Sequence, residues 1–355
     1  MGRRFRKIKF AAYNELFYIF IVLVFCTIIS TIFYHMILIT KTQSKKAVGG
    51  RRVLTANANP VETVIATKTV NTENLTTRPQ LCDKCFLHNF TLLLDNEDIC
   101  NTAEESGYEA DIDVLILVTT THAHYSQREA MRTSWLTDTK NNKGNVRYAF
   151  LLGISASQTE NVQIKQENGI YHDILQEIFI DSYKNLTYKT MMALKWAKTR
   201  CAHAWHILKT DDDVYVNIPG LLKSLKTHAK ALLSAVGGTC PNMAFPVRDK
   251  DSKFYVDIET YPGKYYPTYC SGTAYIMSMT VAKCVLEISE NIPFFPIEDI
   301  YIAFCIHKLG FRFVNIGGFH RFFITPNMCN YKSDWFVTSH GVNPQLVKDV
   351  WKTIC

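Results

Sequence analysis

Residues 205–216 read WHILKTDDDVYV, which is an apolar run, three consecutive aspartates and a second apolar run. Consecutive aspartates usually form a solvated turn, and composition alone favours that interpretation. The flanking runs, however, are typical of strands, so the acids would lie in a tight connection where their charges repel one another unless a cation offsets them. Carboxylate oxygens suit Mg²⁺ or Mn²⁺, and these cations commonly share their coordination positions with phosphate groups. The stretch therefore predicts a divalent-cation site suited to a nucleotide diphosphate.

The residues before this stretch alternate between strand-like and helix-like segments. The continuous apolar run at 114–118 is typical of a strand buried on both faces. Residues 147–152 and 174–180 are also strand-like, whereas 128–135 and 186–200 are compatible with helices. This alternation predicts an α/β fold with a parallel sheet. Ligands of such sheets bind beyond the carboxyl ends of the strands, which is where the three aspartates fall.

A second acidic pair, Glu298 and Asp299, lies in an apolar neighbourhood downstream. Acids are favoured at the N-terminus of a helix by the helix dipole, and this purely structural role is one interpretation. The other is a general base that takes a proton from an incoming hydroxyl. The residues alone leave the two interpretations equally supported.

The N-terminal region contains one long apolar segment. Residues 16–39 are 24 residues without Asp, Glu, Lys or Arg, and a helix of that length rises about 36 Å, enough to cross a hydrocarbon core of about 30 Å. The apolar region of a cleaved signal peptide is normally only about 7–15 residues long, so a retained anchor is favoured. We therefore expect a cytosolic tail at 1–15, a transmembrane signal-anchor at 16–39, a luminal stem at 40–110 and a luminal domain at 111–355.

The positive charge of the chain is concentrated near this segment. The chain carries a net +7, but residues 1–55 hold ten Lys or Arg against one acid, so the remaining residues sum to −2. A nearly neutral folded domain lacks the basic surface that nucleic-acid binding requires. The charge distribution therefore argues against a nucleic-acid partner.

Cysteines and glycosylation sequons indicate which side of the membrane the domain occupies. Ten of the eleven cysteines follow the apolar segment, as do three sequons, at Asn74, Asn89 and Asn185. Cysteines and sequons together are typical of an oxidising lumen, although buried thiols or a metal site are alternatives for the cysteines. The single CxxC motif at 82–85 supports a zinc site only weakly, because a second pair is missing. These features predict a type II membrane protein.

Several ordered blocks between Val114 and Trp351 resemble the β-1,3-galactosyltransferase family, within the inverting β-1,3-hexosyltransferases of glycosyltransferase family 31. The matching blocks are REAMRTSW (128–135), FIDSYKNLTYKT (179–190), KTDDDVYVN (209–217), RDKDSKFYV (248–256), YPTYCSGTAYIMS (266–278), EDIYIAFC (298–305) and VTSH (337–340). Four positions depart from the family pattern: Ala274 and Leu136 where Gly is usual, Ala303 where Gly is frequent, and Phe254 where Trp is common. These departures bear on acceptor preference more than on activity, because the acidic motifs are intact.

The resemblance implies a GT-A type, Rossmann-like fold that binds a UDP-sugar through Mn²⁺, with Mg²⁺ as the alternative. It implies Asp299 as the catalytic base and a metal site at Asp211, Asp213 and His340, in which Asp213 is the direct ligand. A surface histidine with no such role is the alternative for His340. Contacts with the donor are implied for Arg128, Arg132, Lys209, Asp211 and Asp212, although the basic residues would serve equally as partners of structural acids.

The expected activity is transfer of galactose from UDP-galactose, or a related UDP-sugar, to the 3-hydroxyl of a glycan acceptor on a glycoprotein or glycolipid. The resemblance implies a β linkage formed with inversion, by an enzyme of the Golgi membrane. Transfer of N-acetylglucosamine or N-acetylgalactosamine is the runner-up. A catalytically silent chaperone or lectin-like relative and a luminal calcium-binding protein are the alternatives from other classes.

Overall fold

The computed structural model describes residues 85–86, 88–101, 111–325 and 327–355. The expected cytosolic tail, membrane anchor and most of the stem, including Asn74, lie outside the described residues. Within the described residues, no helix combines the length and apolar character needed to cross a membrane.

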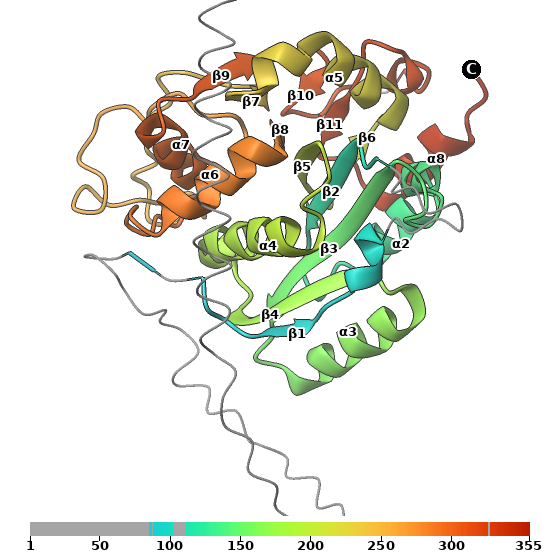
Figure 1. Ribbon diagram of the computed structural model, residues 1–355, viewed down its shortest axis with the longest axis horizontal. Helices are drawn as coiled ribbons and strands as arrows, with labels where there is room; N and C mark the ends of the chain where they lie inside the picture. The colour runs from blue at the N-terminus through green and yellow to red at the C-terminus, as the bar shows by residue number, and fades with distance from the viewer. Residues whose placement is uncertain (1–84, 87, 102–110, 326) are drawn as a thin grey trace, which may run out of the picture. The chain divides into compact units, whose positions relative to one another are not determined.

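A mixed eight-stranded sheet forms the centre of the described part of the chain (Figure 1). Its strands, in spatial order, are β1 (Leu92–Leu94), β4 (Ile174–Ile180), β3 (Val146–Ile154), β2 (Val114–Thr119), β5 (His206–Asp211), β8 (Ala274–Ser278), β7 (Ala235–Gly238) and β9 (Arg312–Asn315). Strands β4, β3, β2 and β5 are parallel to one another, whereas β1 runs antiparallel to β4 and β8 runs antiparallel to β5. The predicted α/β fold is confirmed, with a parallel half and a mixed half.

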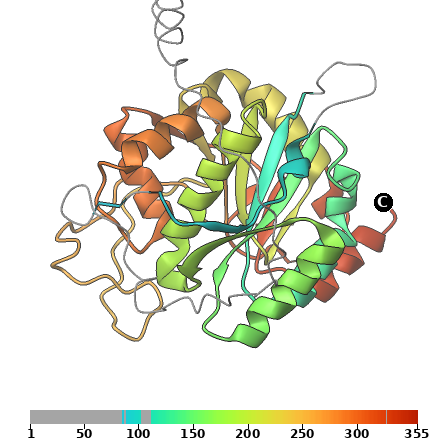
Figure 2. The ribbon, with the colours of Figure 1, turned by 60° about the horizontal axis from the view of Figure 1, so that its bottom comes forward.

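Helices cover both faces of this sheet, as the views in Figures 1 and 2 show. One face carries α4 (Leu186–Arg200), α6 (Met279–Ser289) and α7 (Glu298–Lys308), and the other carries α2 (Tyr125–Arg132), α3 (Gln158–Tyr171), α5 (Ile218–Leu232) and α8 (Pro344–Lys352). Successive residues of β2 enter opposite cores, because side chains alternate across a strand: Leu115 and Leu117 belong to the first core and Ile116 to the second. This explains why the strand reads as one continuous apolar run.

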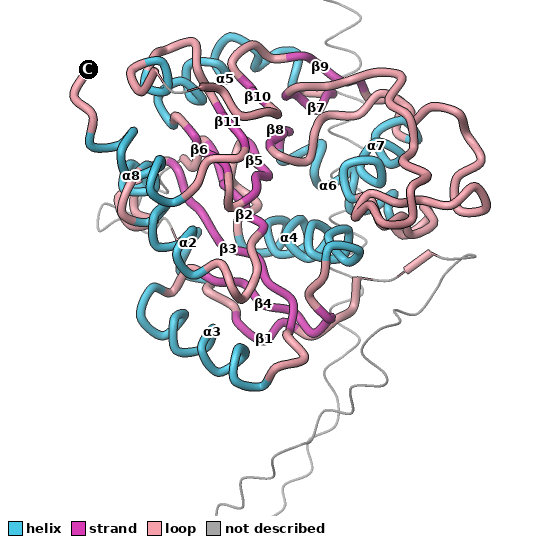
Figure 3. Tube along the Cα trace, turned by 180° about the vertical axis from the view of Figure 1, so that it is seen from behind, coloured by secondary structure: helices cyan, strands magenta, loops and turns pink. Residues whose placement is uncertain are grey.

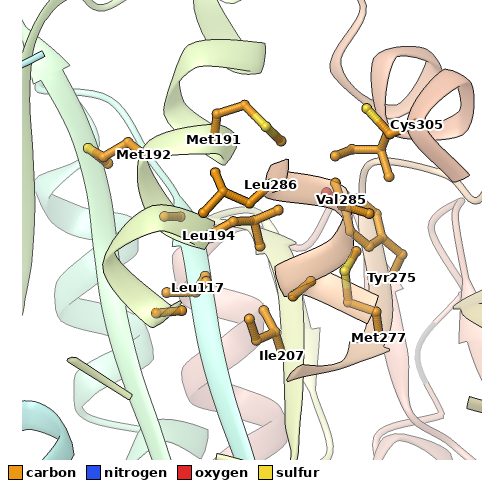
Figure 4. Close-up of a cluster of buried hydrophobic side chains, with 14 of the residues drawn as sticks. Leu117, Met191, Met192, Leu194, Ile207, Tyr275, Met277, Val285, Leu286 and Cys305 are labelled. Atoms are coloured by element: carbon orange, nitrogen blue, oxygen red, sulfur yellow. The ribbon is translucent and has the colours of Figure 1, made fainter. Parts of the chain in front are cut away.

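Figure 4 shows part of the first core, where α4, α6 and α7 meet the sheet. Leu117 of β2 and Ile207 of β5 point toward Leu194 of α4, and all three are at most 3% exposed. Burial of a large aliphatic side chain contributes about 1.5–3 kcal/mol, so this core holds the helices in place over the strands. The carboxyl ends of the strands, where loops leave the sheet, are thereby kept in a fixed arrangement.

A small second sheet lies beside the carboxyl end of β5. It consists of β10 (Phe319–His320), β11 (Thr338–His340) and β6 (Val214–Val216) in that order, and it can be followed from behind in Figure 3. Strand β6 starts directly after the three aspartates and pairs antiparallel with β11, which places His340 opposite Val214. Backbone pairing thus brings His340, from the C-terminal segment, to the acidic turn.

Residues before 111, in the segment predicted as stem, also take part in the fold. Strand β1 extends the sheet from residues 92–94, and a disulfide joins Cys100 to Cys201 at the end of α4. Further disulfides link Cys240 to Cys270 and Cys329 to Cys355. A three-residue edge strand such as β1 is too short to give a periodic signal in the sequence.

Candidate active site

The three aspartates lie at the carboxyl end of β5, as predicted, and each faces a different environment. Asp211 is the last residue of the strand and lies opposite Thr119, the last residue of the parallel neighbour β2. Its carboxylate accepts hydrogen bonds from the Thr119 hydroxyl and from the Lys209 ammonium, the latter at 2.7 Å. Parallel strands thus supply both the carboxylate and the groups that orient it.

Asp213 and His340 face each other directly. Oδ2 of Asp213 lies 3.2 Å from Nε2 of His340, and the aspartate side chain is 46% exposed. Although partial burial works in the opposite direction, the hydrogen bond from His340 holds the pKa of Asp213 below its ordinary value. The same hydrogen bond raises the pKa of His340. The pair is therefore a carboxylate and an imidazole already oriented toward one another.

These residues fit a divalent cation in part. Asp211, Asp213 and His340 line one cavity of about 570 Å³, and their oxygen and nitrogen atoms are ligands that Mn²⁺ accepts. Among the residues described, however, no three His, Cys, Asp or Glu side chains already converge as a metal-binding group. Phosphate oxygens and water would have to complete the coordination shell, which is usual for cations that bind together with a nucleotide.

Asp212 lines the same cavity, but its carboxylate is engaged in hydrogen bonds within the fold. Its Oδ2 accepts hydrogen bonds from the Thr120 hydroxyl at 2.5 Å and lies 2.8 Å from Nδ1 of His124, and only 8% of the side chain is exposed. Asp212 thus links the loop after β2 to the acidic turn through hydrogen bonds. This geometry does not favour the predicted direct contact between Asp212 and the donor.

Asp299 and Glu298 open helix α7 and lie across from the acidic turn. The backbone N–H of Gly272 donates to Oδ2 of Asp299 at 2.9 Å, and the hydroxyl of Tyr275 donates to Glu298 at 2.5 Å. A Cβ atom at position 272 would lie only 3.3 Å from Glu298 and 3.4 Å from Asp299. The glycine thus lets the backbone approach both carboxyl groups closely.

Burial and the adjacent acid change how these two carboxyl groups titrate. Desolvation, together with the negative charge of Glu298, raises the pKa of Asp299 to about 7. Desolvation also raises the pKa of Glu298. A carboxyl group with a pKa near neutrality is suited to accept a proton in catalysis. The pair thus opens a helix, as the structural interpretation predicted, and both side chains also line a cavity.

A cavity of about 370 Å³ connects these groups. Its wall includes Asp299, Asp211 and His340, so the residues predicted from two distant segments do meet at one site. Lys209 lies between the two acidic groups, 2.7 Å from Asp211 and 3.7 Å from Glu298. Although burial favours the neutral amine, these carboxylates raise the pKa of Lys209 and keep it charged.

Arg128 and Arg132 were predicted to contact the donor, but in the structure they pair with acidic side chains. Arg128 is 0% exposed, and its guanidinium forms two hydrogen bonds with Glu167, at 2.8 and 2.6 Å. Arg132 pairs with the same glutamate and with Asp173, each at 2.8 Å. Both therefore act as partners of structural acids, which was the stated alternative. Arg128 also donates to the Thr121 carbonyl at 2.6 Å and so supports the loop beside the acidic turn.

We expect the substitution Arg128→Met to destabilise the protein by about 3 kcal/mol, because it leaves Glu167 buried with half of its counter-charge removed. Thermal unfolding monitored by circular dichroism measures the effect. Lys198→Met is the matched control, because it breaks an exposed ion pair: the Lys198 side chain is 40% exposed and that of Glu287 is 66% exposed. This variant should change stability by less than about 1 kcal/mol. Equal midpoints for the two variants would contradict the structural role of Arg128.

Several residues at the site carried no sequence signal of their own. Thr119 ends strand β2 and Thr120 follows it, and the apolar pattern of the strand gives no hint of their contacts with the aspartates. Lys253, from a loop, and Tyr183, at the start of a short 3-10 helix, line both cavities, and the Lys253 ammonium lies 5.1 Å from the centre of the Tyr183 ring. Both residues fall in sequence blocks that match the family pattern. Their contacts could not be predicted, because residues outside the main strands and helices acquire partners only when the whole chain folds.

The two described sequons differ in exposure. Asn89 is exposed. The Asn185 amide donates to the Ile180 carbonyl at 2.8 Å, at the start of α4, and Thr187 of the same sequon is fully buried. In the folded state, Asn89 is thus the more accessible of the two.

Comparison with known proteins identifies the class to which this arrangement belongs. Residues 126–316 match the sequence model of the family described as galactosyltransferase, and the chain is a glycosyltransferase. It is 35% identical over 290 residues to β-1,3-galactosyltransferase 1 of Homo sapiens and of Mus musculus, which covers 81% of this chain and 84% of the relative. It is 31% identical over 244 residues to β-1,3-galactosyltransferase 5 of Pan paniscus, covering 68% of this chain and 80% of that one. The chain belongs to the β-1,3-galactosyltransferase family, as the sequence blocks predicted.

Among solved structures, the galactosyltransferase LgtC in complex with donor and acceptor sugar analogues aligns with 68% of this chain and 97% of its own, at 13% identity and a TM-score of 0.34. That score is too low to bear on the details of the fold.

Proposed function

We propose that this protein transfers galactose from UDP-galactose to the 3-hydroxyl of a glycan acceptor, with inversion to a β linkage, in a GT-A type active site that uses Mn²⁺. The observation that carries the proposal is Asp299. Its carboxyl group, with a pKa of about 7, faces the same cavity as Asp211 and His340. The names of the relatives support galactose as the donor sugar.

The residues divide between two tasks in this mechanism. Asp213 and His340, with Asp211 beside them, would hold a divalent cation, which when bound offsets negative charge on the departing diphosphate. Asp299 accepts the proton of the acceptor hydroxyl while that oxygen forms a bond to the anomeric carbon. The bond from that carbon to the diphosphate oxygen breaks, and UDP leaves with the electron pair. The attack and departure occur on opposite faces, so the configuration inverts.

A donor screen tests this proposal. The full-length protein is incubated with UDP-galactose, UDP-N-acetylglucosamine and UDP-N-acetylgalactosamine and with galactosyl-, glucosyl- and N-acetylhexosaminyl-terminated acceptors, and the linkage of each product is determined. UDP affinity is measured in parallel with Mn²⁺, with Ca²⁺ and with EDTA. Product made only from an N-acetylhexosamine donor would replace galactose in the proposal. Mn²⁺-dependent UDP binding without any transfer would favour a silent relative, and no UDP affinity at all would refute the active-site assignment.

The titration of Asp299 predicts the pH dependence of the reaction. A base must be deprotonated to work, so kcat/KM should rise about tenfold per pH unit below pH 7 and level off above it. The measurement is kcat/KM between pH 5 and pH 9 at saturating Mn²⁺. An activity that is constant down to pH 5 would mean that the catalytic base titrates far below the value expected for Asp299.

We further propose a Golgi membrane location with the catalytic domain in the lumen. The sequence of residues 16–39 and the disulfides Cys100–Cys201, Cys240–Cys270 and Cys329–Cys355 support it, since disulfides persist in oxidising compartments.

Luminal exposure predicts N-glycosylation, with Asn89 as the most accessible described acceptor. Treatment of the protein from secretory cells with peptide N-glycosidase should lower its mass by at least one glycan, and Asn89→Gln should remove one of the glycans. An unchanged mass after treatment would count against a luminal domain.

A further inference from the structure

Four cationic side chains are buried within the described residues, and one of them lacks a counter-charge. Arg128 pairs with Glu167 at 2.6 Å, Lys189 with Asp181 at 2.8 Å and Lys209 with Asp211 at 2.7 Å. Arg147 is only 3% exposed, yet it forms no ion pair with the described residues, and its Nε and Nη1 atoms have no hydrogen-bond partner. A buried guanidinium without a counter-charge is costly, so a partner for Arg147 is missing from the chain as described.

Arg147 lies at the amino end of a strand, whereas the active site lies at the carboxyl ends of the strands. It is the second residue of β3 and pairs with Leu115 of β2, whereas Thr119 of β2 pairs with Asp211. Four residues separate these positions along β2, or roughly 13 Å at about 3.3 Å per residue. A ligand beside Arg147 would therefore not occupy the donor site.

The space beside Arg147 exists because strand β4 starts late. The pairing of β3 with β4 begins only at Phe150 and Ile174, so residues 146–149 of β3 have no strand on that side. The Asn142 amide replaces the missing strand by hydrogen-bonding to the backbone of Tyr148, at 2.7 and 3.1 Å. A cavity of about 890 Å³ remains between this region, residues 98–101 and the end of α3. We call it the Arg147 cavity.

The charges that face this cavity are mainly positive. Arg147 is joined by the exposed Lys143 and by Arg132, whose Nη1 atom is buried without a partner although its other nitrogens pair with acids. His172 also lines the cavity, and the acid on its wall is the exposed Asp98. Burial lowers the pKa of Arg147, which is the direction expected for a cation held away from water without a counter-ion.

We propose that the Arg147 cavity binds a phosphate or sulfate group carried by a sugar. The planar guanidinium is the side chain best suited to hold tetrahedral oxyanions through several N–H donors, and Arg147 and Arg132 offer three such donor atoms without partners. The cavity is much larger than a single oxyanion, and polar side chains such as Asn141 and Thr133 on its wall suit the hydroxyl groups of a sugar. The site would bind an anionic saccharide away from the reaction centre.

The test is the thermal unfolding midpoint of the full-length protein in non-ionic detergent with EDTA, at constant ionic strength. Galactose 6-sulfate, galactose 6-phosphate, inorganic sulfate and inorganic phosphate are each compared with chloride. Binding should raise the midpoint by about 3–5 °C at ten times the dissociation constant. The sugar esters should act at lower concentrations than the inorganic ions. No rise with any of the four would overturn the proposal, and equal potency of esters and inorganic ions would overturn its sugar component.

Two variants locate the effect. Arg147→Met should abolish the rise, and Arg147→Lys should retain part of it. Arg312→Met, which removes an exposed arginine on β9, is the matched control and should respond like the wild type. A rise that Arg147→Met retains in full would place the anion elsewhere and overturn the assignment.

The same assay separates a bound ligand from an acidic segment of the chain. Glu104, Glu105 and Glu109 lie outside the described residues. Changing all three to Gln should leave the anion response as it is. An anion affinity raised tenfold or more would identify these carboxylates as competitors for Arg147 and overturn the proposal.

Discussion

Replacing Asp299 with Asn should lower kcat by about 10²- to 10⁴-fold, the usual contribution of a general base. The substitution preserves size, and the Asn carbonyl oxygen can still accept the hydrogen bond from Gly272 N–H, which is 2.9 Å long in the wild type. What is lost is the ability to take a proton from the acceptor hydroxyl. The measurement is initial-rate transfer at saturating donor and acceptor.

The binding of UDP separates loss of the base from loss of the fold. Because Asp299 lies at the α7 end of the cavity and not among the proposed metal ligands, Asp299→Asn should keep its Mn²⁺-dependent affinity for UDP within about twofold. Glu287→Gln, which alters an exposed acid on α6, is the matched control and should transfer at the wild-type rate. Unimpaired turnover by Asp299→Asn would refute its assignment as the base.

Replacing Asp213 with Ala should weaken UDP binding in Mn²⁺ by at least about tenfold. Asp213 and His340 face each other at 3.2 Å, and removal of one charged ligand from a divalent-cation site leaves fewer protein oxygens to hold the cation beside the diphosphate. Isothermal titration calorimetry with UDP, in Mn²⁺ and in EDTA, measures the difference. The affinity in EDTA should be the same for variant and wild type.

Asp249→Ala serves as the control, since it removes an exposed aspartate from a loop outside the metal-site residues. It should bind UDP with the wild-type metal dependence. His340→Ala should resemble Asp213→Ala, because the two side chains contribute to the same site. If the wild type bound UDP equally well with Mn²⁺ and with EDTA, the metal site at the acidic turn would be refuted.

The elements that the sequence predicted well are those that are long, apolar or periodic. The run at 174–180 and the helix at 186–200 have the bounds that the structure shows for β4 and α4. Large apolar residues at both ends of the first segment, and apolar residues at helical spacing in the second, made these two elements recognisable. The edge strand at 92–94 escaped notice because three residues of an exposed edge carry no comparable pattern.

The sequence left open which partners several charged side chains have. Arg128 and Arg132 occur in a family block and were expected near the donor, but the structure pairs them with Glu167 and Asp173. Asp212 was grouped with its neighbours, although adjacent residues of a turn point in different directions. The sequence does not show which group a charged side chain faces, because that group can lie tens of residues away along the chain.

Local pattern thus predicted several of the strands and helices, and together with the family blocks it pointed to the acids of residues 211–213 and 298–299 as candidates for chemistry. Those inferences depend on near neighbours: apolar periodicity, and like charges placed side by side. Tertiary structure alone decided that Asp299 shares a cavity with Asp211 and His340, that Asp212 turns toward Thr120 and His124, and that Arg147 is buried without a counter-charge. Such pairings depend on strand order and on the space between elements, which packing of the whole chain determines.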